Sequence, residues 1–349
     1  MIFQNSVVRF IAFFIPVKDM RENFVKSYSR KTKFAKLRED NKKLFKLVKQ
    51  LSIENQKIKQ EQAFLKSMLK NHTWLSPLED NSKIYLSIAC IAKNEGMFLK
   101  EWIEYHRIVG VERFYFYDNE SSDNTREILD PYISDGIVIY RYVVGKAMQN
   151  PVYQDAILKA RGKTRWLALI DLDEFIVPVE KDSVPEFLRD YEQYPGIEID
   201  RMEFDHNDHE TCPTEHGGLV TANYTRVLKF PERDIKRYIK SIVNPNEVVY
   251  VNSPHSFNYK NDYAVSEDFE PCEGYAKKCL TISKIRINHY HTRSIEDGKR
   301  NRQRGSAWER KNVVIKPRAL YLFKNKETTD DHVIQKYLQQ LKEAMGIND

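Results

Sequence analysis

The sequence predicts an α/β fold built on a mainly parallel sheet, because short apolar runs alternate with helical patterns through the middle of the chain. Residues 84–92 and 166–170 are apolar and bounded by polar residues, as buried strands are. Residues 113–117 and 136–143 supply two more strands. A chain of 349 residues, 41% of them hydrophobic, is long enough for one large domain or two ordinary ones.

Helical segments separate these strands. The first carries Phe98, Trp102 and Ile103 on one face, and the next two are expected over residues 126–132 and 152–160. Strands that alternate with helices in this way form a parallel sheet. Near the end of the chain, helical spacing of apolar residues predicts a C-terminal helix within 328–349.

Polar turns follow three strands of this predicted sheet. Asn94 and Glu95 follow the first strand, Asp118 ends the second, and Asp171 and Asp173 follow the fourth. Ligands of open α/β sheets bind outside the carboxyl ends of the strands. The three turns therefore indicate a nucleotide pocket at that edge.

The acidic turn after the fourth strand suggests a metal. In an extended segment Asp171 and Asp173 lie on the same side, while Leu172 points back into the core. Carboxylate oxygens of this kind suit Mg²⁺ or Mn²⁺, whose shell a substrate phosphate completes. We expect a divalent cation that holds a diphosphate. A solvated acidic turn is the alternative.

The N-terminal 75 residues are basic. They contain 17 Lys and Arg against 6 Asp and Glu, a net charge of +11, whereas the rest of the chain has 39 against 44, a net charge of −5. The apolar run 2–17 falls short of the roughly 20 residues that span a membrane, and it lacks the features of a signal peptide. We expect residues 1–33 to lie on an anionic membrane surface as a basic amphipathic segment. Docking on the protein's own body is the alternative.

A heptad repeat follows this segment. Apolar residues recur every seven positions. The positions three residues before each of them form a second column, which is half polar and includes Asn41 and Asn55, a pattern typical of a coiled coil with a fixed register. We expect a coiled coil over residues 34–75 and self-association, as a dimer or trimer, through residues 34–70. One long helix packed on the catalytic body is the alternative. The apolar column comprises Leu37, Leu44, Leu51, Ile58 and Leu65.

The cysteine pattern indicates the cellular compartment of the protein, and the lysines raise the question of a nucleic-acid partner. The four cysteines contain no Cys-x-x-Cys pair, which fits reduced thiols in the cytosol. With the basic segment, this predicts a cytoplasmic protein held at the cytosolic face of a membrane. We expect no nucleic-acid partner, because no groove-reading motif or interleaved aromatic residues accompany the lysines.

A set of motifs over residues 84–306 resembles a known family. Together they are similar to the GT-A nucleotide-sugar glycosyltransferases, most closely to glycosyltransferase families 2 and 92, including bacterial members found with surface-polysaccharide genes. The motifs are Ala92-Lys93-Asn94-Glu95, Asp118-Asn119-x-Ser121-x-Asp123-x-Thr125, Asp171-Leu172-Asp173-Glu174-Phe175, Lys240-Ser241-Ile242-Val243, Pro254-His255, Ile287-Asn288-His289-Tyr290, Arg293-Ser294 and Arg304-Gly305.

The resemblance implies a fold and a set of site residues. The fold is GT-A, a Rossmann-like mixed sheet with flanking helices, here over residues 82–325. A Mn²⁺ or Mg²⁺ site is implied at Asp171, Asp173 and His289, with His291 as the second choice for the histidine ligand. Contacts with the nucleotide donor are implied for Asn94, Glu95, Asp118, Asn119, Gln154, Arg161, Lys163 and Asp171.

The reaction implied is transfer of a sugar from a UDP-sugar to a glycan or lipid-linked acceptor, with inversion. Inversion requires a carboxylate that takes a proton from the acceptor hydroxyl. Asp208 is our choice, with Asp205 and Glu174 as alternatives. Residues 202–210 lack the glycine- and serine-rich stretch of the family, which leaves the base unsettled.

Two other classes of protein remain open on the sequence. A sugar-nucleotide-forming nucleotidyltransferase would carry a glycine-rich loop near the first strand, and residues 92–95 do not form one. A non-enzymatic coiled-coil scaffold with a nucleotide-binding body would be favoured if replacing Asp171 or Asp173 left its function intact.

Overall fold

The computed structural model describes residues 84–228, 237–260, 263–272, 276–277, 281–304 and 327–347, and three lysines, Lys26, Lys43 and Lys46. The chain divides into two units, Met1–Ser76 and Pro77–Asp349, and the structure below belongs to the second. The expected membrane-associating segment and coiled coil lie outside the described residues, those lysines apart. Within the described ranges, no helix is long and apolar enough to cross a membrane.

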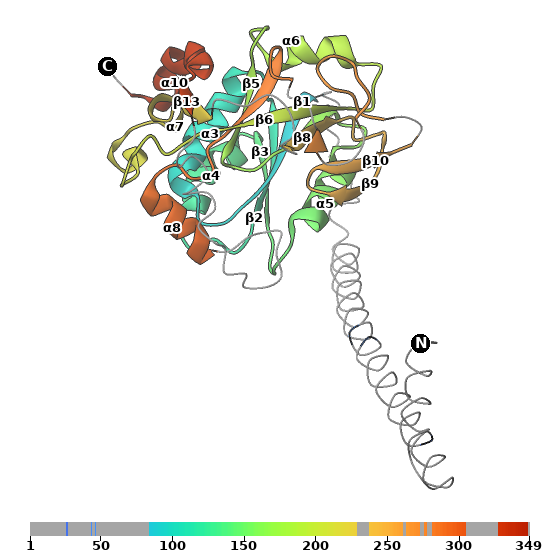
Figure 1. Ribbon diagram of the computed structural model, residues 1–349, viewed down its shortest axis with the longest axis horizontal. Helices are drawn as coiled ribbons and strands as arrows, with labels where there is room; N and C mark the ends of the chain where they lie inside the picture. Colours follow the sequence, from blue (N-terminus) through green and yellow to red (C-terminus); the bar gives the residue numbers. More distant parts are fainter. Residues whose placement is uncertain are drawn as a thin grey trace, which may run out of the picture. The chain divides into compact units, whose positions relative to one another are not determined.

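A nine-stranded mixed sheet forms the centre of the second unit, with the order β3-β2-β1-β4-β8-β6-β12-β5 and β11 paired to β8 (Figure 1). The first four of these strands are parallel. β8 is antiparallel to β4 and β6, and β12 is parallel to β6 but antiparallel to β5. The strands are β1 (Ile84–Ala92), β2 (Arg113–Asp118), β3 (Val138–Tyr142), β4 (Thr164–Leu169), β5 (Glu174–Pro178), β6 (Gly196–Glu203), β8 (Arg237–Val243), β11 (Ala276–Lys277) and β12 (Ile285–His289).

The α/β class predicted from the sequence is confirmed, and the sheet is the mixed one that the resemblance implied. The expected strands and helices between residues 84 and 170 differ from those observed by at most three residues at either end. The helices are α3 (Gly96–Ile108), α4 (Thr125–Ser134), α5 (Gln149–Ala160), α6 (Val184–Leu188), α7 (Val220–Asn223), α8 (Ile295–Arg304) and α10 (Leu338–Met345).

Helix α3 shows how the layers are joined. Its apolar positions place Trp102 and Tyr105 in the core without exposed surface. The Trp102 indole Nε1 donates to the Glu174 carbonyl oxygen at 2.8 Å, and the Tyr105 hydroxyl donates to the Ile176 carbonyl oxygen at 2.9 Å. Buried polar groups need such partners, and each large apolar side chain so buried contributes about 1.5–3 kcal/mol. The helix is thereby fixed on β5.

Strand direction brings one set of strand ends together. β1, β2, β3, β4, β6 and β12 all run the same way, so their carboxyl ends share one edge of the sheet. β5 and β8 run the opposite way, and both begin at that edge. Asp118, Glu203 and His289 are the last residues of β2, β6 and β12, and the acidic turn lies between β4 and β5.

The C-terminal segment contains less helix than expected. Residues 328–330 form β13 (Thr328–Asp330), which pairs with β7 (Arg226–Leu228), and only α10 is α-helical. Thr328 and Thr329 are β-branched residues that favour a strand. A short 3₁₀ turn with buried Ile334 and Tyr337 precedes α10, so this segment packs on the body. The remaining smaller elements are η2 (Arg189–Tyr191), η3 (Pro213–His216), η4 (Val333–Tyr337), β9 (Val248–Ser253) and β10 (Ser256–Tyr259).

Candidate functional site

Three side chains with metal-binding atoms meet at the carboxyl edge of the sheet. Asp173, His289 and His291 each offer one ligand atom, and these atoms lie within 4.8 Å of one another. Asp173 Oδ2 is 3.5 Å from His289 Nε2 and 3.6 Å from His291 Nδ1. Asp173 comes from the turn before β5, and both histidines come from the end of β12 and the residues after it.

The donor set indicates which metal fits. One carboxylate oxygen with two imidazole nitrogens suits Mn²⁺ or another transition metal better than Mg²⁺, which prefers oxygen ligands throughout. Asp173 and His289, two of the expected ligands, are therefore together. The third member is His291, the second choice of the sequence, in place of Asp171.

Asp171 lies outside this group because its oxygens already have partners. Its Oδ2 is 2.7 Å from the Lys240 ammonium, and its Oδ1 accepts from Gln149 Nε2 at 2.7 Å and from the Tyr153 hydroxyl at 3.2 Å. The expectation that Asp171 and Asp173 share a side assumed an extended segment. β4 ends at Leu169, and the chain turns before Asp173, so the alternation of a strand is lost.

A chain of alternating charges connects the two aspartates. Lys240 Nζ is 3.1 Å from Glu174 Oε2, and Glu174 Oε1 accepts from Arg201 at 3.2 Å. Arg201 also donates to Glu203 Oε1 at 2.9 Å, and Glu203 Oε2 lies 2.5 Å from His289 Nδ1. Each buried charge in the chain has an opposite charge on both sides. The complete order is Asp171, Lys240, Glu174, Arg201, Glu203, His289 and Asp173.

The pKa values follow from this arrangement. Burial alone would raise the pKa of Asp173, but the positive charge of His289 and the hydrogen bonds from His289 and His291 outweigh it and hold that pKa well below its usual range. Burial would lower the pKa of His289, and Glu203 and Asp173 instead raise it to about 10. For Glu174 burial prevails and raises the pKa despite Lys240. Asp173 is thus anionic, and His289, which is protonated in the metal-free protein, must release its Nε2 proton to bind a metal.

The turns after β1 and β2 are tied to each other at the same edge. The Asn94 side-chain oxygen accepts from the Ser122 backbone N–H at 2.7 Å, and the Asn94 N–H donates to Ser121 Oγ at 2.9 Å. Asp118 accepts from the Ser121 N–H at 2.8 Å and from the Tyr140 hydroxyl at 2.9 Å. The expected donor-binding residues of these turns are therefore brought together.

Two further expected residues brace neighbouring segments at this edge. Asn119 Nδ2 donates to the Val143 and Gly145 carbonyl oxygens at 3.3 and 3.0 Å, which holds the loop after β3. Glu95 is 3.2 Å from Arg293, whose guanidinium lies 3.6 Å from the centre of the Phe98 ring. Arg293 thereby links the turn after β1 to the segment that follows the two histidines.

Three predicted donor contacts lie elsewhere. Arg161 and Lys163 precede β4, so they lie at the opposite edge of the sheet from Asp171, about 20 Å of strand away. Arg161 donates to the carbonyl oxygens of Pro245 and Val248 there. Gln154 is in the middle of α5, where its Oε1 accepts from the Val251 N–H at 3.1 Å and holds β9. The structure therefore corrects these three predictions.

Residues 83–345 match the family model of glycosyltransferase family 92. The chain belongs to glycosyltransferase family 92. It is 31% identical over 211 residues to a family 92 protein of Oryza sativa subsp. japonica, a match that covers 59% of this chain and 33% of the rice protein. It is 26% identical over 208 residues to a galactan beta-1,4-galactosyltransferase of Arabidopsis thaliana, covering 55% and 38% of the two chains. The chain thus spans little more than a third of the length of these curated relatives.

Solved structures with some similarity include one in complex with UDP and a mannosyltransferase. Staphylococcus aureus TarS 1-349 in complex with UDP matches with a TM-score of 0.28 and 14% identity, over 34% of this chain and 36% of that one. The mannosyltransferase PcManGT from Pyrobaculum calidifontis, in complex with GDP-Man and Mn²⁺, matches with a TM-score of 0.26 and 15% identity, over 39% and 43%. Such scores carry no argument by themselves. Family 92 membership and the mixed α/β sheet bear out the family resemblance seen in the sequence and the expected GT-A fold.

The three carboxylates considered as the base have different surroundings. Asp208 is 76% exposed and forms a double contact with Arg226, at 2.7 and 3.0 Å. Arg226 also pairs with Asp205, which is 3% exposed. Glu174 is fully buried between Lys240 and Arg201. Only Asp208 of the three is open to solvent.

Sequence reasoning missed several residues of the site. Gln149 and Tyr153 lie on the first turns of α5, five positions and one position before the predicted Gln154. The direction of α5 could have indicated both residues, because the N-terminus of this helix faces the edge of the sheet where the carboxyl ends of the parallel strands lie. Arg201 and Glu203 lie on β6, and an ionisable residue within an apolar strand pattern was the available signal for them. Lys240 belongs to one of the motifs of the resemblance, but no role in the site was expected for it.

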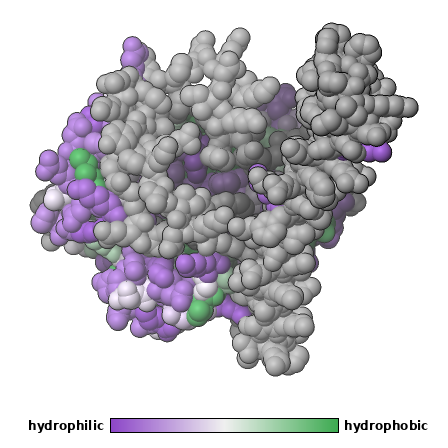
Figure 2. All heavy atoms as spheres, turned by 60° about the horizontal axis from the view of Figure 1, so that its bottom comes forward, coloured by the Kyte–Doolittle hydropathy of each residue, from purple (hydrophilic) through white to green (hydrophobic). Residues whose placement is uncertain are grey.

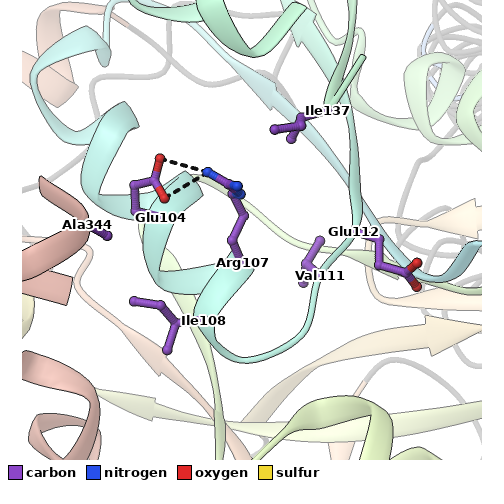
Figure 3. Close-up of a pocket in the computed structure, with 7 residues that line it drawn as sticks. All are labelled: Glu104, Arg107, Ile108, Val111, Glu112, Ile137 and Ala344. Atoms are coloured by element: carbon purple, nitrogen blue, oxygen red, sulfur yellow. Dashed lines mark hydrogen bonds and ion pairs between the residues drawn. The ribbon is translucent and has the colours of Figure 1, made fainter. Parts of the chain in front are cut away.

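The family 92 site is distinct from a pocket of about 690 Å³ at the other edge of the sheet. In Figure 3, Glu104 and Arg107 of α3 point toward each other in that pocket, 3.0 Å apart at their closest. No residue predicted for the site lines it. The other lining residues are Ile108, Val111, Glu112, Ile137 and Ala344.

The described part of the surface is mainly hydrophilic in the view of Figure 2. Such a surface suits polar ligands better than apolar ones. The exposed large hydrophobic residues of the described ranges are Met97, Tyr142, Val144, Val249, Tyr250, Tyr263 and Phe269.

Proposed function

We propose that this family 92 protein is a metal-dependent glycosyltransferase that moves a sugar from a nucleotide-diphosphate donor to a glycan or lipid-linked acceptor. The observation that supports this most is the group of Asp173, His289 and His291 at the sheet edge where Asp118 and Asn94 also lie. Ligands of such sheets bind at that edge. The three side chains fit Mn²⁺, and when bound the ion would supply positive charge opposite the leaving diphosphate.

The protein's own residues have separate tasks in this proposal. Asp173, His289 and His291 hold the ion, and Asp118 faces the nucleoside. Lys240 and the α5 residues keep Asp171 anionic and in one orientation, since its two oxygens accept from three donors. Asp171 is therefore an acceptor that is already in one orientation before the nucleotide donor binds.

UDP is our proposed nucleotide, and galactose is the sugar to test first. Two curated relatives from Arabidopsis thaliana are galactan beta-1,4-galactosyltransferases, 26% and 25% identical to this chain. A role in surface polysaccharide or glycoconjugate synthesis remains part of the proposal.

Asp208 remains our proposed base for an inverting transfer. A base must reach the acceptor hydroxyl, and Asp208 is open to solvent, whereas Asp205 and Glu174 are buried and paired. The contact with Arg226 lowers the pKa of Asp208 and keeps it ionised. Only an ionised carboxylate can take a proton from the acceptor hydroxyl.

The test is release of nucleoside diphosphate from UDP-galactose and other nucleotide sugars, with a glycan acceptor and with Mn²⁺, Mg²⁺ or EDTA. We expect Asp173→Asn to reduce the rate by more than about a hundredfold, because changes behind the ligands alone cost 10–100-fold. Asp208→Asn is expected to lose transfer yet to bind Mn²⁺ and UDP as wild type does. Activity that survives both EDTA and Asp173→Asn contradicts the metal-dependent reaction.

Two proposals about the rest of the chain depend on the sequence alone. Residues 1–33 would bind an anionic membrane surface at the cytosolic face, and residues 34–70 would self-associate as a dimer or trimer. Their support is the net charge of +11 over residues 1–75 and the heptad of apolar residues. Such an arrangement would bring the enzyme to a lipid-linked acceptor. No observation favours the nucleotidyltransferase or the scaffold over the transferase.

A further inference from the structure

His289 is held by a carboxylate on the neighbouring strand. Glu203 ends β6 and His289 ends β12, and the two are direct partners in the parallel register. Glu203 Oε2 lies 2.5 Å from His289 Nδ1. His289 Nε2 then faces Asp173 Oδ2 at 3.5 Å. One ring nitrogen is therefore committed to Glu203, and the other points to the metal position.

Glu203 is itself held from behind. Its second oxygen, Oε1, accepts from Arg201 Nη2 at 2.9 Å. Arg201 lies two positions earlier on β6, so the two side chains are on the same face. Arg201 Nη1 donates in turn to Glu174 Oε1 at 3.2 Å, and the side chains of Arg201 and Glu203 are only 14% and 23% exposed. Both carboxylate oxygens of Glu203 thus have fixed partners, which leaves one orientation for His289.

We propose that Glu203 is a positioning residue that orients His289 as a metal ligand, with Arg201 as its anchor. The inference rests on the proposed metal site. A histidine that binds a metal through one nitrogen commonly gives its other N–H to a carboxylate, which fixes the ring and strengthens the ligand. Glu203 supplies that carboxylate from a strand outside the metal group.

A purely structural ion pair predicts a different result. Such a pair would stabilise the contact of β6 with β12, and its loss would lower the unfolding free energy without changing the affinity for a metal. A positioning role instead predicts that the affinity for a metal falls although the three ligand residues, Asp173, His289 and His291, are unchanged in the sequence. Metal affinity therefore separates the two roles.

The experiment titrates Mn²⁺ into the full-length protein and measures free Mn²⁺ by its electron paramagnetic resonance signal. Glu203→Gln is the variant, because glutamine has an NH₂ donor in place of one carboxylate oxygen and so cannot accept at both the Arg201 and the His289 position. We expect Mn²⁺ affinity to fall by about 10–100-fold. Glu198→Gln is the matched control: Glu198 is on the same strand, is 4% exposed and accepts from Ser241 Oγ at 2.6 Å. Its Mn²⁺ affinity is expected to equal that of wild type.

A second variant guards against misfolding. Glu203→Asp keeps the charge but is one methylene too short to span both partners, and it is also expected to weaken Mn²⁺ binding. In pulsed paramagnetic resonance, the imidazole nitrogen coupling to bound Mn²⁺ should weaken in both Glu203 variants. Equal Mn²⁺ affinity in wild type and in a folded Glu203 variant overturns the inference and leaves the metal site intact. A wild-type protein that binds no Mn²⁺ overturns the metal site as well.

Discussion

At the scale of single residues, the site depends on buried charges that compensate each other. Lys240 is 1% exposed and Glu174 is fully buried, so neither reaches water. Burial alone would lower the pKa of Lys240, but Asp171 and Glu174 outweigh it and keep the pKa above its usual value. A buried ion pair adds little by itself, whereas removal of one partner leaves an uncompensated charge. Lys240 should therefore be intolerant of a neutral replacement.

We predict that Lys240→Met lowers the unfolding free energy by about 3–5 kcal/mol, because Asp171 and Glu174 lose their shared counter-ion. Guanidinium denaturation of the metal-free protein measures this. Lys100→Met is the control: Lys100 is exposed and donates to the Met345 carbonyl oxygen, so a change within about 0.5 kcal/mol is expected. Equal denaturation midpoints for the two variants would contradict the role of Lys240.

At the scale of secondary structure, a buried histidine joins α3 to β5. His106 Nδ1 is 2.8 Å from the Trp102 carbonyl oxygen, and His106 Nε2 accepts from the Ile176 N–H at 3.2 Å. The acceptor role requires a neutral ring. Burial lowers the pKa of His106 to about 3, against a usual value of 6.5. The packing of these two elements therefore carries a dependence on pH.

The unfolded chain binds a proton at His106 as the pH falls below 6.5, and the folded protein does not bind it until about pH 3. This contribution to stability is full above pH 6.5 and is lost as the pH falls from 6.5 toward 3. The loss is about 1.4 kcal/mol per pH unit, or roughly 2 kcal/mol at pH 5. Melting temperatures of wild type and His106→Asn between pH 5 and 8 should show a smaller decline for the variant. Parallel profiles would exclude His106 as the cause.

At the scale of the whole molecule, the edge of the sheet collects groups that are distant in the chain. The turn at Asn94, the end of β2 and the histidines after β12 come together only when the sheet is complete. A ligand that bridges them binds the folded protein and not the unfolded chain. Binding should therefore be visible as global stabilisation.

UDP together with Mn²⁺ is expected to raise the unfolding free energy by about 2.7 kcal/mol at a concentration one hundred times its Kd. UDP with EDTA should give a clearly smaller effect, because the diphosphate then loses its contact with the metal group. Thermal denaturation of the full-length protein measures both conditions. Asp173→Asn should abolish the difference between them, and identical melting curves with and without metal in wild type would contradict a metal-bridged donor.

Much of the fold was predictable from short-range pattern. The strands at 84–92, 113–118 and 164–169 are apolar runs between polar turns, and each pairs with its neighbour as a parallel sheet requires. The same reasoning located Asp173, and the resemblance added His289. The expected contacts of Arg161 and Lys163 with the nucleotide donor did not agree with the structure, because both residues precede β4. Residues before a strand lie at the opposite edge of the sheet from residues after it.

The sequence by itself determined the α/β class, the acidic turn and the resemblance to glycosyltransferases, because these depend on residues that are close along the chain. Only the tertiary structure decided that His291 joins the metal group while Asp171 pairs with Lys240. It also decided that Arg201 and Glu203 stand behind His289. These contacts join separate strands, and their register depends on how the sheet packs as a whole, which no local pattern specifies.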